Sequence, residues 1–388
     1  MTGAVQILSD PGLQFRAMWA DVVVGPAEFK EHLLRHATKV AAVVVAAALG
    51  LAACGNSSDN TPAGSNTSAG TGTQATGKKI VVGIAYGVGG RGDQSFNASA
   101  AVGLDKAKAD LGVEFKEATQ VNGESEAATE ERLQQFIDAG ATHVIGVGFA
   151  YAKAIGAVSK ANPDVKFAII DDASPDSAGA NVAQLTFAEE QGSFLVGAAA
   201  ALKSKTNTVG FVGGVGVDLI KKFEAGYVAG AKAAKPSIVV KSQYLSQPPD
   251  FSGFNDPAKG KTAAEGLFQG GSDVVYHAAG GSGSGVFTAA KAAGALAIGV
   301  DSDQALTATP DVRDVILTSM IKKVDVAVYE FLKAASAGAD ITGNKVFDLK
   351  ANGVDYATTG GKVDDIKSQL DAYKAKIVSG EITVPTKP

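Results

Sequence analysis

Polar and charged side chains directly follow several apolar, β-branched runs of the chain, and these positions hold its candidate binding residues. Parallel strands of an α/β sheet end at one edge, and ligands bind in the crevice beyond those carboxyl ends. Carboxylates and amides at such positions can hydrogen-bond a ligand. We therefore expect a small-molecule cleft that collects residues from several strand ends. The segments are 87–97, 169–172, 210–214, 276–285 and 299–304.

The first segment is a glycine-rich loop that leads into a helix. Its four glycines allow the backbone to approach a ligand closely, and Asp93 or Ser95 is placed to cap the helix. Phe96 is either a staple that packs onto the helix or a platform on which a flat ligand stacks. The pattern alone favours the staple.

From residue 79 onward, β-branched runs alternate with alanine-rich amphipathic stretches. Apolar strands separated by helices predict parallel sheets covered on both faces. The rhythm restarts after a helix at 188–203, so two doubly wound α/β lobes in series are expected. The expected strands are 79–86, 113–118, 142–148, 165–171, 208–213, 237–244, 273–277, 295–301, 315–319 and a strand-like piece at 345–349. The expected helices are 97–111, 125–139, 188–203, 219–234, 258–269, 284–294 and 322–337.

Charge and rare residue types argue against several classes of protein. The net charge is −5, without the clustered basic face that binds nucleic acid. One cysteine and four histidines leave no disulfide or thiolate zinc site and argue against a multi-histidine metal site. The signatures of dinucleotide enzymes, P-loop proteins and serine hydrolases are missing. We therefore expect a protein that is not an enzyme and that uses no cofactor and no metal.

The single cysteine, Cys54, ends the sequence Leu-Ala-Ala-Cys, which resembles the lipidation site of bacterial lipoproteins. The apolar run 40–49 is too short to span a membrane and suits a signal peptide. Residues 1–53 are therefore expected to be a lipoprotein signal peptide with an over-long start. Residues 54–77 would be the lipidated cysteine and a flexible linker. The alternative is a short buried helix with an incidental cysteine.

Seven motifs, in order, resemble the basic membrane protein (BMP) family of lipoproteins over nearly all of residues 78–388. These extracytoplasmic proteins resemble the PnrA-like purine-nucleoside receptors of ABC importers. The resemblance implies the type I periplasmic-binding-protein fold, in which two doubly wound lobes are joined by a hinge. The motifs are 93–97, 211–214, 223–227, 256–260, 279–283, 299–304 and 318–323.

The resemblance also implies how the base of a nucleoside would be held. Phe96 matches a family phenylalanine that stacks on the base, and Asn97 and Asp172 would contact its edge. The second aromatic side chain of the sandwich stays open among Phe223, Phe254 and Tyr276.

The ribose would be bound by carboxylates, backbone amides and one lysine. Asp301, Asp303, Gly280 and Gly281 would accept from or donate to its hydroxyl groups, and Lys322 would balance the carboxylates. The expected ligand-binding set is Asp93, Phe96, Asn97, Asp172, Phe223, Gly280, Gly281, Asp301, Asp303 and Lys322.

One position departs from the family pattern. The family usually carries an aspartate six residues before the position of Asp93, where this chain has Gly87. A charge-assisted hydrogen bond is worth about 1.5–3 kcal/mol, so the preferred ligand stays open. Gln94 or Arg91 could substitute for the missing carboxylate, or the ligand differs.

The sequence thus predicts an extracytoplasmic, lipid-anchored solute-binding protein of an ABC importer. It would capture a nucleoside, with a purine favoured, and deliver it to the permease and ATPase subunits. It is expected to be a monomer. A sugar or other small solute, or a sensing role, is the alternative; the lack of tryptophan after residue 19 argues against a sugar. The expected lobes are 78–187 with about 313–340, and 188–312 with about 341–388.

Overall fold

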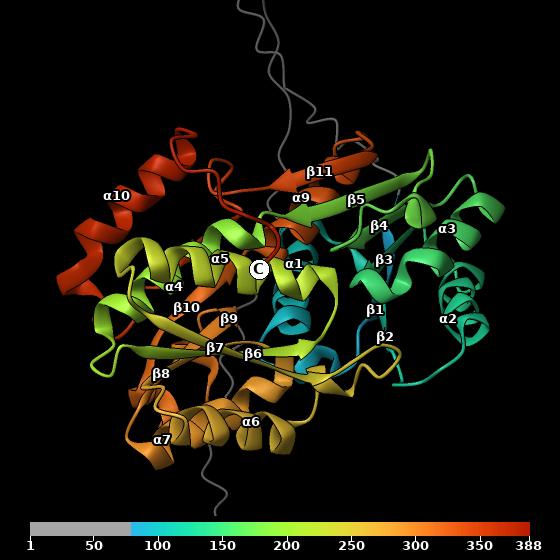
Figure 1. Ribbon diagram of the computed structural model, residues 1–388. Helices are drawn as coiled ribbons and strands as arrows, with labels where there is room; N and C mark the ends of the chain where they lie inside the picture. Colours follow the sequence, from blue (N-terminus) through green and yellow to red (C-terminus); the bar gives the residue numbers. More distant parts are fainter. Residues whose placement is uncertain (1–78) are drawn as a thin grey trace, which may run out of the picture. The chain divides into compact units, whose positions relative to one another are not determined.

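The computed structural model describes residues 79–388, which form two α/β lobes, each built on a six-stranded sheet (Figure 1). All pairs in the first sheet are parallel, whereas in the second sheet the last strand is antiparallel to its neighbour. The first sheet runs β11 (Gly343–Phe347), β5 (Val182–Phe187), β4 (Lys166–Ile170), β3 (His143–Val147), β1 (Val81–Tyr86), β2 (Glu114–Thr119). The second runs β12 (Val354–Tyr356), β10 (Ile316–Lys322), β9 (Leu296–Asp301), β8 (Val274–Ala278), β6 (Thr208–Val215), β7 (Val239–Ser246).

Pairs of helices cover both faces of each sheet (Figure 1). On the first sheet, α1 (Phe96–Leu111) packs with α9 (Val324–Ser336), and α2 (Glu126–Asp138) packs with α3 (Ala152–Ala161). On the second sheet, α4 (Glu189–Lys203) packs with α5 (Asp218–Ala234), and α6 (Pro257–Gln269) with α7 (Gly283–Ala293). The short α8 (Gln304–Thr307) follows β9, and α10 (Lys367–Val378) packs on α4.

The apolar runs become central strands because both of their faces are buried. Along β1, Val82 and Ile84 join the core under α1 and α9, while Ala85 joins the core under α2 and α3. Strands β1, β3 and β4 are buried along almost their whole length, whereas the edge strand β2 is mostly exposed. This confirms the prediction of parallel sheets covered on both faces.

The backbones of α4 and α5 touch at glycines. A Cβ atom at Gly197 would lie 2.1 Å from the Tyr227 carbonyl oxygen, and one at Gly230 would lie 1.9 Å from that of Phe194. Such distances are sterically impossible, so these positions need a residue without a side chain. These glycines therefore allow α4 and α5 to pack in direct backbone contact.

The chain crosses between the lobes three times, after β5, after β10 and after β11. The crossing segments lie side by side, since Ala188 N donates to Phe347 O (3.1 Å) and Lys323 N donates to Gly353 O (2.9 Å). The rings of Phe187 and Phe347 stack there with centroids 5.2 Å apart. These segments form the connection about which the lobes can move.

The structure corrects the expected composition of the lobes. Strand β10, expected in the first lobe, pairs with β9 in the second sheet, and β11, expected in the second lobe, pairs with β5 in the first. The pairing partner of a strand is a long-range property that its own apolar pattern does not encode. Three helices and two strands were also not predicted, namely α3, α8 and α10, and β5 and β12.

Candidate functional site

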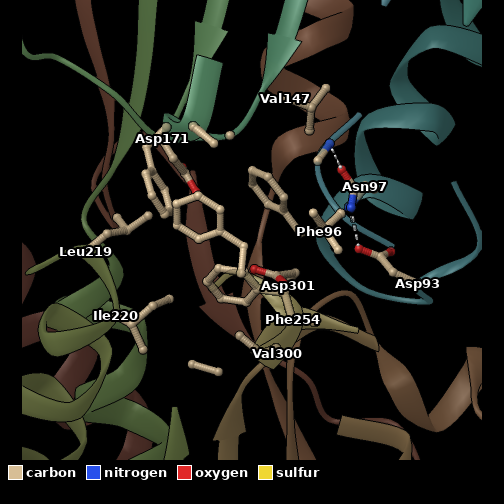
Figure 2. Close-up of a pocket in the computed structure, with 18 of the residues that line it drawn as sticks. Asp93, Phe96, Asn97, Val147, Asp171, Leu219, Ile220, Phe254, Val300 and Asp301 are labelled. Atoms are coloured by element: carbon tan, nitrogen blue, oxygen red, sulfur yellow. Dashed lines mark hydrogen bonds between the residues drawn. The ribbon is translucent and has the colours of Figure 1, made fainter. Parts of the chain in front are cut away.

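Within the described part of the chain, a cavity lies where the strand ends of both sheets meet (Figure 2). The space between its wall atoms is about 720 Å³, including the part open to solvent. The first lobe contributes the ends of β1 to β4 and the start of α1, and the second contributes α5 and the ends of β8, β9 and β10. The cavity therefore lies where the sequence predicted a cleft.

A buried ammonium group lies at one end of this cavity. The Lys322 side chain is 1 % exposed, donates from Nζ to Asp171 Oδ2, and has Glu189 Oε1 at 3.1 Å. Burial alone would lower the pKa of Lys322, but the charges of Asp171, Glu189 and Asp301 raise it above its ordinary value. Lys322 therefore remains a cation at neutral pH.

Two aspartates line the cavity beside this cation, one from each lobe. Burial raises the pKa of Asp171 to about 7 and that of Asp301 to about 6. Asp301 Oδ2 accepts from Ser95 Oγ at 2.6 Å, but Asp171 Oδ1 has no hydrogen-bond partner within residues 79–388. A buried acceptor without a partner costs free energy, which a ligand hydroxyl group donating to Asp171 Oδ1 would offset.

Both aspartates have a left-handed backbone, with φ of 66° at Asp171 and 64° at Asp301. This conformation costs on the order of 1–3 kcal/mol for a residue other than glycine and is concentrated at functional sites. Asp171 directly follows β4 and Asp301 is the last residue of β9, and these two strands hold the same place in the order of their sheets. The left-handed turn points both carboxylates into the cavity.

Aromatic rings surround the ammonium group. Lys322 Nζ lies 5.0 Å from the ring centroid of Phe96, 5.1 Å from that of Phe187 and 5.3 Å from that of Phe223. Cation–π attraction to several rings favours the charged form of the lysine. Of the predicted residues, Phe96, Phe223 and Lys322 are thus brought together.

Phe96 is the first residue of α1 and lines the cavity, although it also packs against the core as the staple interpretation expects. Asp93 positions it, because its carboxylate accepts from the backbone N–H groups of Ser95, Asn97 and Ala98, each at 2.9 Å. Of the two predicted caps, Asp93 therefore caps the helix, whereas the Ser95 side chain does not. The carboxylate lines the cavity but is fully engaged with the helix start.

Asn97 is held by its neighbours rather than left free for a ligand (Figure 2). Its Nδ2 donates to Asp93 Oδ2 and its Oδ1 accepts from Gly87 N, both at 2.9 Å. Only its second N–H and second lone pair remain for a ligand.

A second group of aromatic rings lies where the lobes meet. Phe149 of the first lobe makes edge-to-face contacts with Phe251 (5.8 Å) and Phe254 (6.5 Å) of the second lobe. All three line the cavity, whereas Tyr276 is fully buried and does not. Of the three candidates for the second aromatic wall, Phe223 and Phe254 therefore remain.

Three predicted residues do not line the cavity and are corrected. Asp172 Oδ1 instead accepts from the backbone N–H of Ser174 at 3.0 Å. Asp303 accepts from Thr359 Oγ1, and Gly281 lies outside the wall to which Gly280 belongs. The prediction chose Asp172 where the structure places its neighbour Asp171 in the wall. Neighbouring residues at a strand end point in different directions, so only one of the two lines the cavity.

Sequence reasoning missed several wall residues. Asp171 carried a signal in the Asp-Asp pair that follows its strand. Glu189 does not line the cavity but contacts Lys322 from the start of α4, and no local pattern indicated this contact. Gln120 follows an exposed edge strand without a long apolar run, so no pattern singled it out. Phe149 and Phe251 lie in loops.

The position that departs from the family pattern, Gly87, lines the cavity without a side chain. A Cβ atom there would lie 3.2 Å from the Val147 carbonyl oxygen. Arg91 pairs with Asp105 and Glu117 outside the cavity, and Gln94 does not line it. Neither candidate substitute supplies the missing group.

Hydrogen bonds join the lobes on both sides of the cavity. Ser302 Oγ donates to Ser95 O at 3.1 Å. At the other side, Asn122 of the first lobe bonds twice to the second lobe. Its Nδ2 donates to Asp250 Oδ1 and its Oδ1 accepts from Phe251 N, both at 3.0 Å. We call Asn122, Asp250 and Phe251 the clasp.

Within residues 79–388, no cluster of histidine, cysteine and acidic side chains is suited to hold a metal ion. No helix in that range is long and apolar enough to span a membrane. Cys54 and the expected signal peptide and linker lie outside the described residues.

Comparison with known proteins identifies the family. Residues 79–387 match the Bmp family of PnrA-like ABC transporter substrate-binding proteins. A CD4+ T-cell-stimulating antigen from Listeria innocua is 36% identical over 89% of this chain and 97% of its own length. A protein from Lactococcus lactis named ABC transporter nucleoside-binding protein BmpA is 36% identical over 80% of this chain and 89% of its own.

A solved structure agrees with these relatives. A solute-binding protein of an ABC transporter system from Aeropyrum pernix superposes with a TM-score of 0.69 at 29% identity, over 79% of this chain and 93% of that one. The predicted type I periplasmic-binding-protein fold is confirmed, as is the prediction that the chain is not an enzyme. The chain belongs to the family of PnrA-like ABC transporter substrate-binding proteins.

Proposed function

We propose that the protein captures a nucleoside in this cavity and delivers it to a membrane permease. The observation that carries the proposal is the pairing of aromatic walls with a buried cation and two carboxylates at one end. A flat base stacks on aromatic rings, whereas ribose hydroxyl groups need charged acceptors and a donor. The Lactococcus relative named as nucleoside-binding supports the same ligand class.

In this proposal, the base stacks on Phe96, with Phe254 as the opposite wall. The ribose hydroxyl groups donate to Asp171 Oδ1 and Asp301 and accept from Lys322. Burial of both ends of the ligand requires that the lobes open and close about their three connections. The permease would recognise the closed form, which the clasp helps to hold.

We further propose that the protein is a lipoprotein on the outer face of the cell membrane, anchored through Cys54, and that it acts as a monomer. The motif Leu-Ala-Ala-Cys and the apolar run before it support the anchor. Labelling of cells with palmitate tests it: the wild-type chain should carry the label, and Cys54→Ala should not.

Calorimetric titration with adenosine, guanosine, inosine, cytidine and ribose tests the ligand, after ligand carried from the cell has been removed by refolding from denaturant. Micromolar or tighter binding of purine nucleosides is expected. Phe96→Ala should weaken it by about 10- to 100-fold, since stacking and about 1.5–3 kcal/mol of apolar burial are lost.

Phe115→Ala is the matched control, because Phe115 is half-buried on β2 and does not line the cavity. It should bind like the wild type. Binding of ribose alone, or of no nucleoside by a folded protein, would contradict the proposal.

A further inference from the structure

The polar side chains of the cavity wall are unevenly distributed. Asp171, Asp301 and Lys322 lie together at one end. Gln120 lines the cavity from the end of β2, at the edge of the first sheet. Strands β3 and β1 separate β4 from β2, so at about 4.8 Å per strand Gln120 and Asp171 are about 14 Å apart. Groups so far apart contact opposite ends of a ligand.

Gln120 retains its full hydrogen-bonding capacity. Its side-chain amide makes no hydrogen bond to any residue in 79–388, and the residue is half-buried in the wall. The Asn97 side chain on α1 has less hydrogen-bonding capacity left for a ligand, because it is already bonded to Gly87 and Asp93. At this end of the cavity, Gln120 is the side chain best able to donate to and accept from a ligand.

Among the described residues that line the cavity, none offers a free carboxylate beside Gln120, since that of Asp93 is bonded to the start of α1. Strands β1 and β2 pair Tyr86 with Thr119, so the next residues, Gly87 and Gln120, are adjacent at the ends of the two strands. Gly87 contributes no side chain. This end of the cavity therefore offers a neutral amide, in contrast to the charged end.

Aromatic side chains surround the same end. Phe149 lies in the loop after β3, the strand next to β1. Phe251 belongs to the clasp, and Asn122, another member of the clasp, lies two residues after Gln120. Phe149 also contacts Phe254. A base stacked between Phe96 and Phe254, the walls proposed above, would present its edge, not its face, to Gln120. Hydrogen-bonding groups on that edge are what distinguish one base from another.

We propose that Gln120 reads the edge of the nucleobase, and that its neutral amide makes the site accept adenine and cytosine as well as guanine. The proposal rests on the function proposed above. A primary amide offers one donor beside one acceptor, which matches N6–H with N1 of adenine, N4–H with N3 of cytosine, and O6 with N1–H of guanine. A carboxylate offers acceptors only and matches the adjacent N1–H and N2–H of guanine.

The variant Gln120→Glu separates these cases. Adenosine, cytidine and guanosine are titrated calorimetrically into the full-length wild type and variant at about pH 8, where a glutamate is ionised. Binding of adenosine and cytidine should weaken by about tenfold or more, while guanosine changes by less than about threefold. Gln120→Ala, which removes the amide without adding charge, should weaken all three similarly.

Thermal unfolding of each variant checks that the fold is retained, as expected for a half-buried side chain without protein hydrogen bonds. If Gln120→Glu changes the three affinities by one common factor, or changes none, this inference is wrong while the nucleoside function stands. If the folded wild type binds none of the three nucleosides, the proposed function fails, and this inference fails with it.

Discussion

Asp171 combines several features that each disfavour the folded state. Its backbone is left-handed, its carboxylate is buried, and one of its oxygens has no partner among the described residues. The compensating contact is the ion pair with Lys322, which reaches it from the other lobe. Such a group is unfavourable for stability and is retained where binding requires it.

The pH dependence of stability tests this view of Asp171. Burial raises its pKa in the folded protein to about 7, while the pKa of an unfolded aspartate is about 4. The folded protein therefore binds more protons than the unfolded chain between about pH 4 and 7. The contribution of Asp171 to stability is present below about pH 4 and is lost as the pH rises to 7.

In the variant Asp171→Asn, the side chain is uncharged at every pH, so this loss of stability does not occur. Its free energy of unfolding relative to the wild type should rise by about 1 kcal/mol or more between about pH 5 and pH 8, measured by urea denaturation. Taking the difference between variant and wild type removes the contributions of other titrating groups. His277 is one such group, since burial lowers its pKa to about 4. A difference that does not change with pH would show that Asp171 is ionised throughout.

Among the secondary-structure elements, the α4–α5 pair depends on glycines at its contact. Gly230→Ala would place a methyl group 1.9 Å from the Phe194 carbonyl oxygen. The helices would have to separate, and overpacking of this kind costs about 1–3 kcal/mol. The free energy of unfolding in urea should fall by that amount.

Gly266→Ala is the control for this prediction. Gly266 lies within α6, and a Cβ atom there would have no atom within 4 Å. Alanine restricts the unfolded chain and favours a helix, so this variant should be unchanged or more stable by about 0.4–1 kcal/mol. Equal destabilisation by both substitutions would mean that helix packing is not the cause.

For the whole molecule, ligand release requires that the contacts between the lobes break. The clasp supplies two of these contacts at the aromatic end, and both involve the Asn122 side chain. Asn122→Ala removes them without touching the cavity wall. With about 0.5–1.5 kcal/mol per hydrogen bond, ligand should dissociate about tenfold faster.

Dissociation rates measured by surface plasmon resonance check this prediction. Asn344→Ala is the control, because Asn344 accepts a hydrogen bond from Thr186 within the first lobe. Its dissociation rate should equal that of the wild type. An unchanged rate in Asn122→Ala would show that the clasp does not hold the closed form.

The sequence alone predicted the local structure better than the long-range pairing. Apolar runs and glycine turns located most strands to within a few residues, because a strand that is buried on both faces is itself a continuous apolar run. The assignment of β10 and β11 to lobes was wrong, since it depends on which strands pair across the chain.

In the candidate site, too, local features were predicted better than long-range ones. Residues that follow an apolar strand, such as Asp301, or begin a helix, such as Phe96, were found from local pattern and family resemblance. Asp171 was missed by one position because the left-handed turn that selects it over Asp172 is not visible in the sequence. Gln120 ends an exposed edge strand, where pattern carries little information.

The three connections between the lobes also determine the order in which the chain can complete its fold during synthesis. Strand β5 ends the first continuous segment of the first sheet, but its outer neighbour β11 is made only after the whole of β6 to β10. Until then one edge of β5 is unpaired, and open edges invite pairing with other chains. A nascent chain of this protein must therefore be protected from aggregation until nearly all of it has left the ribosome.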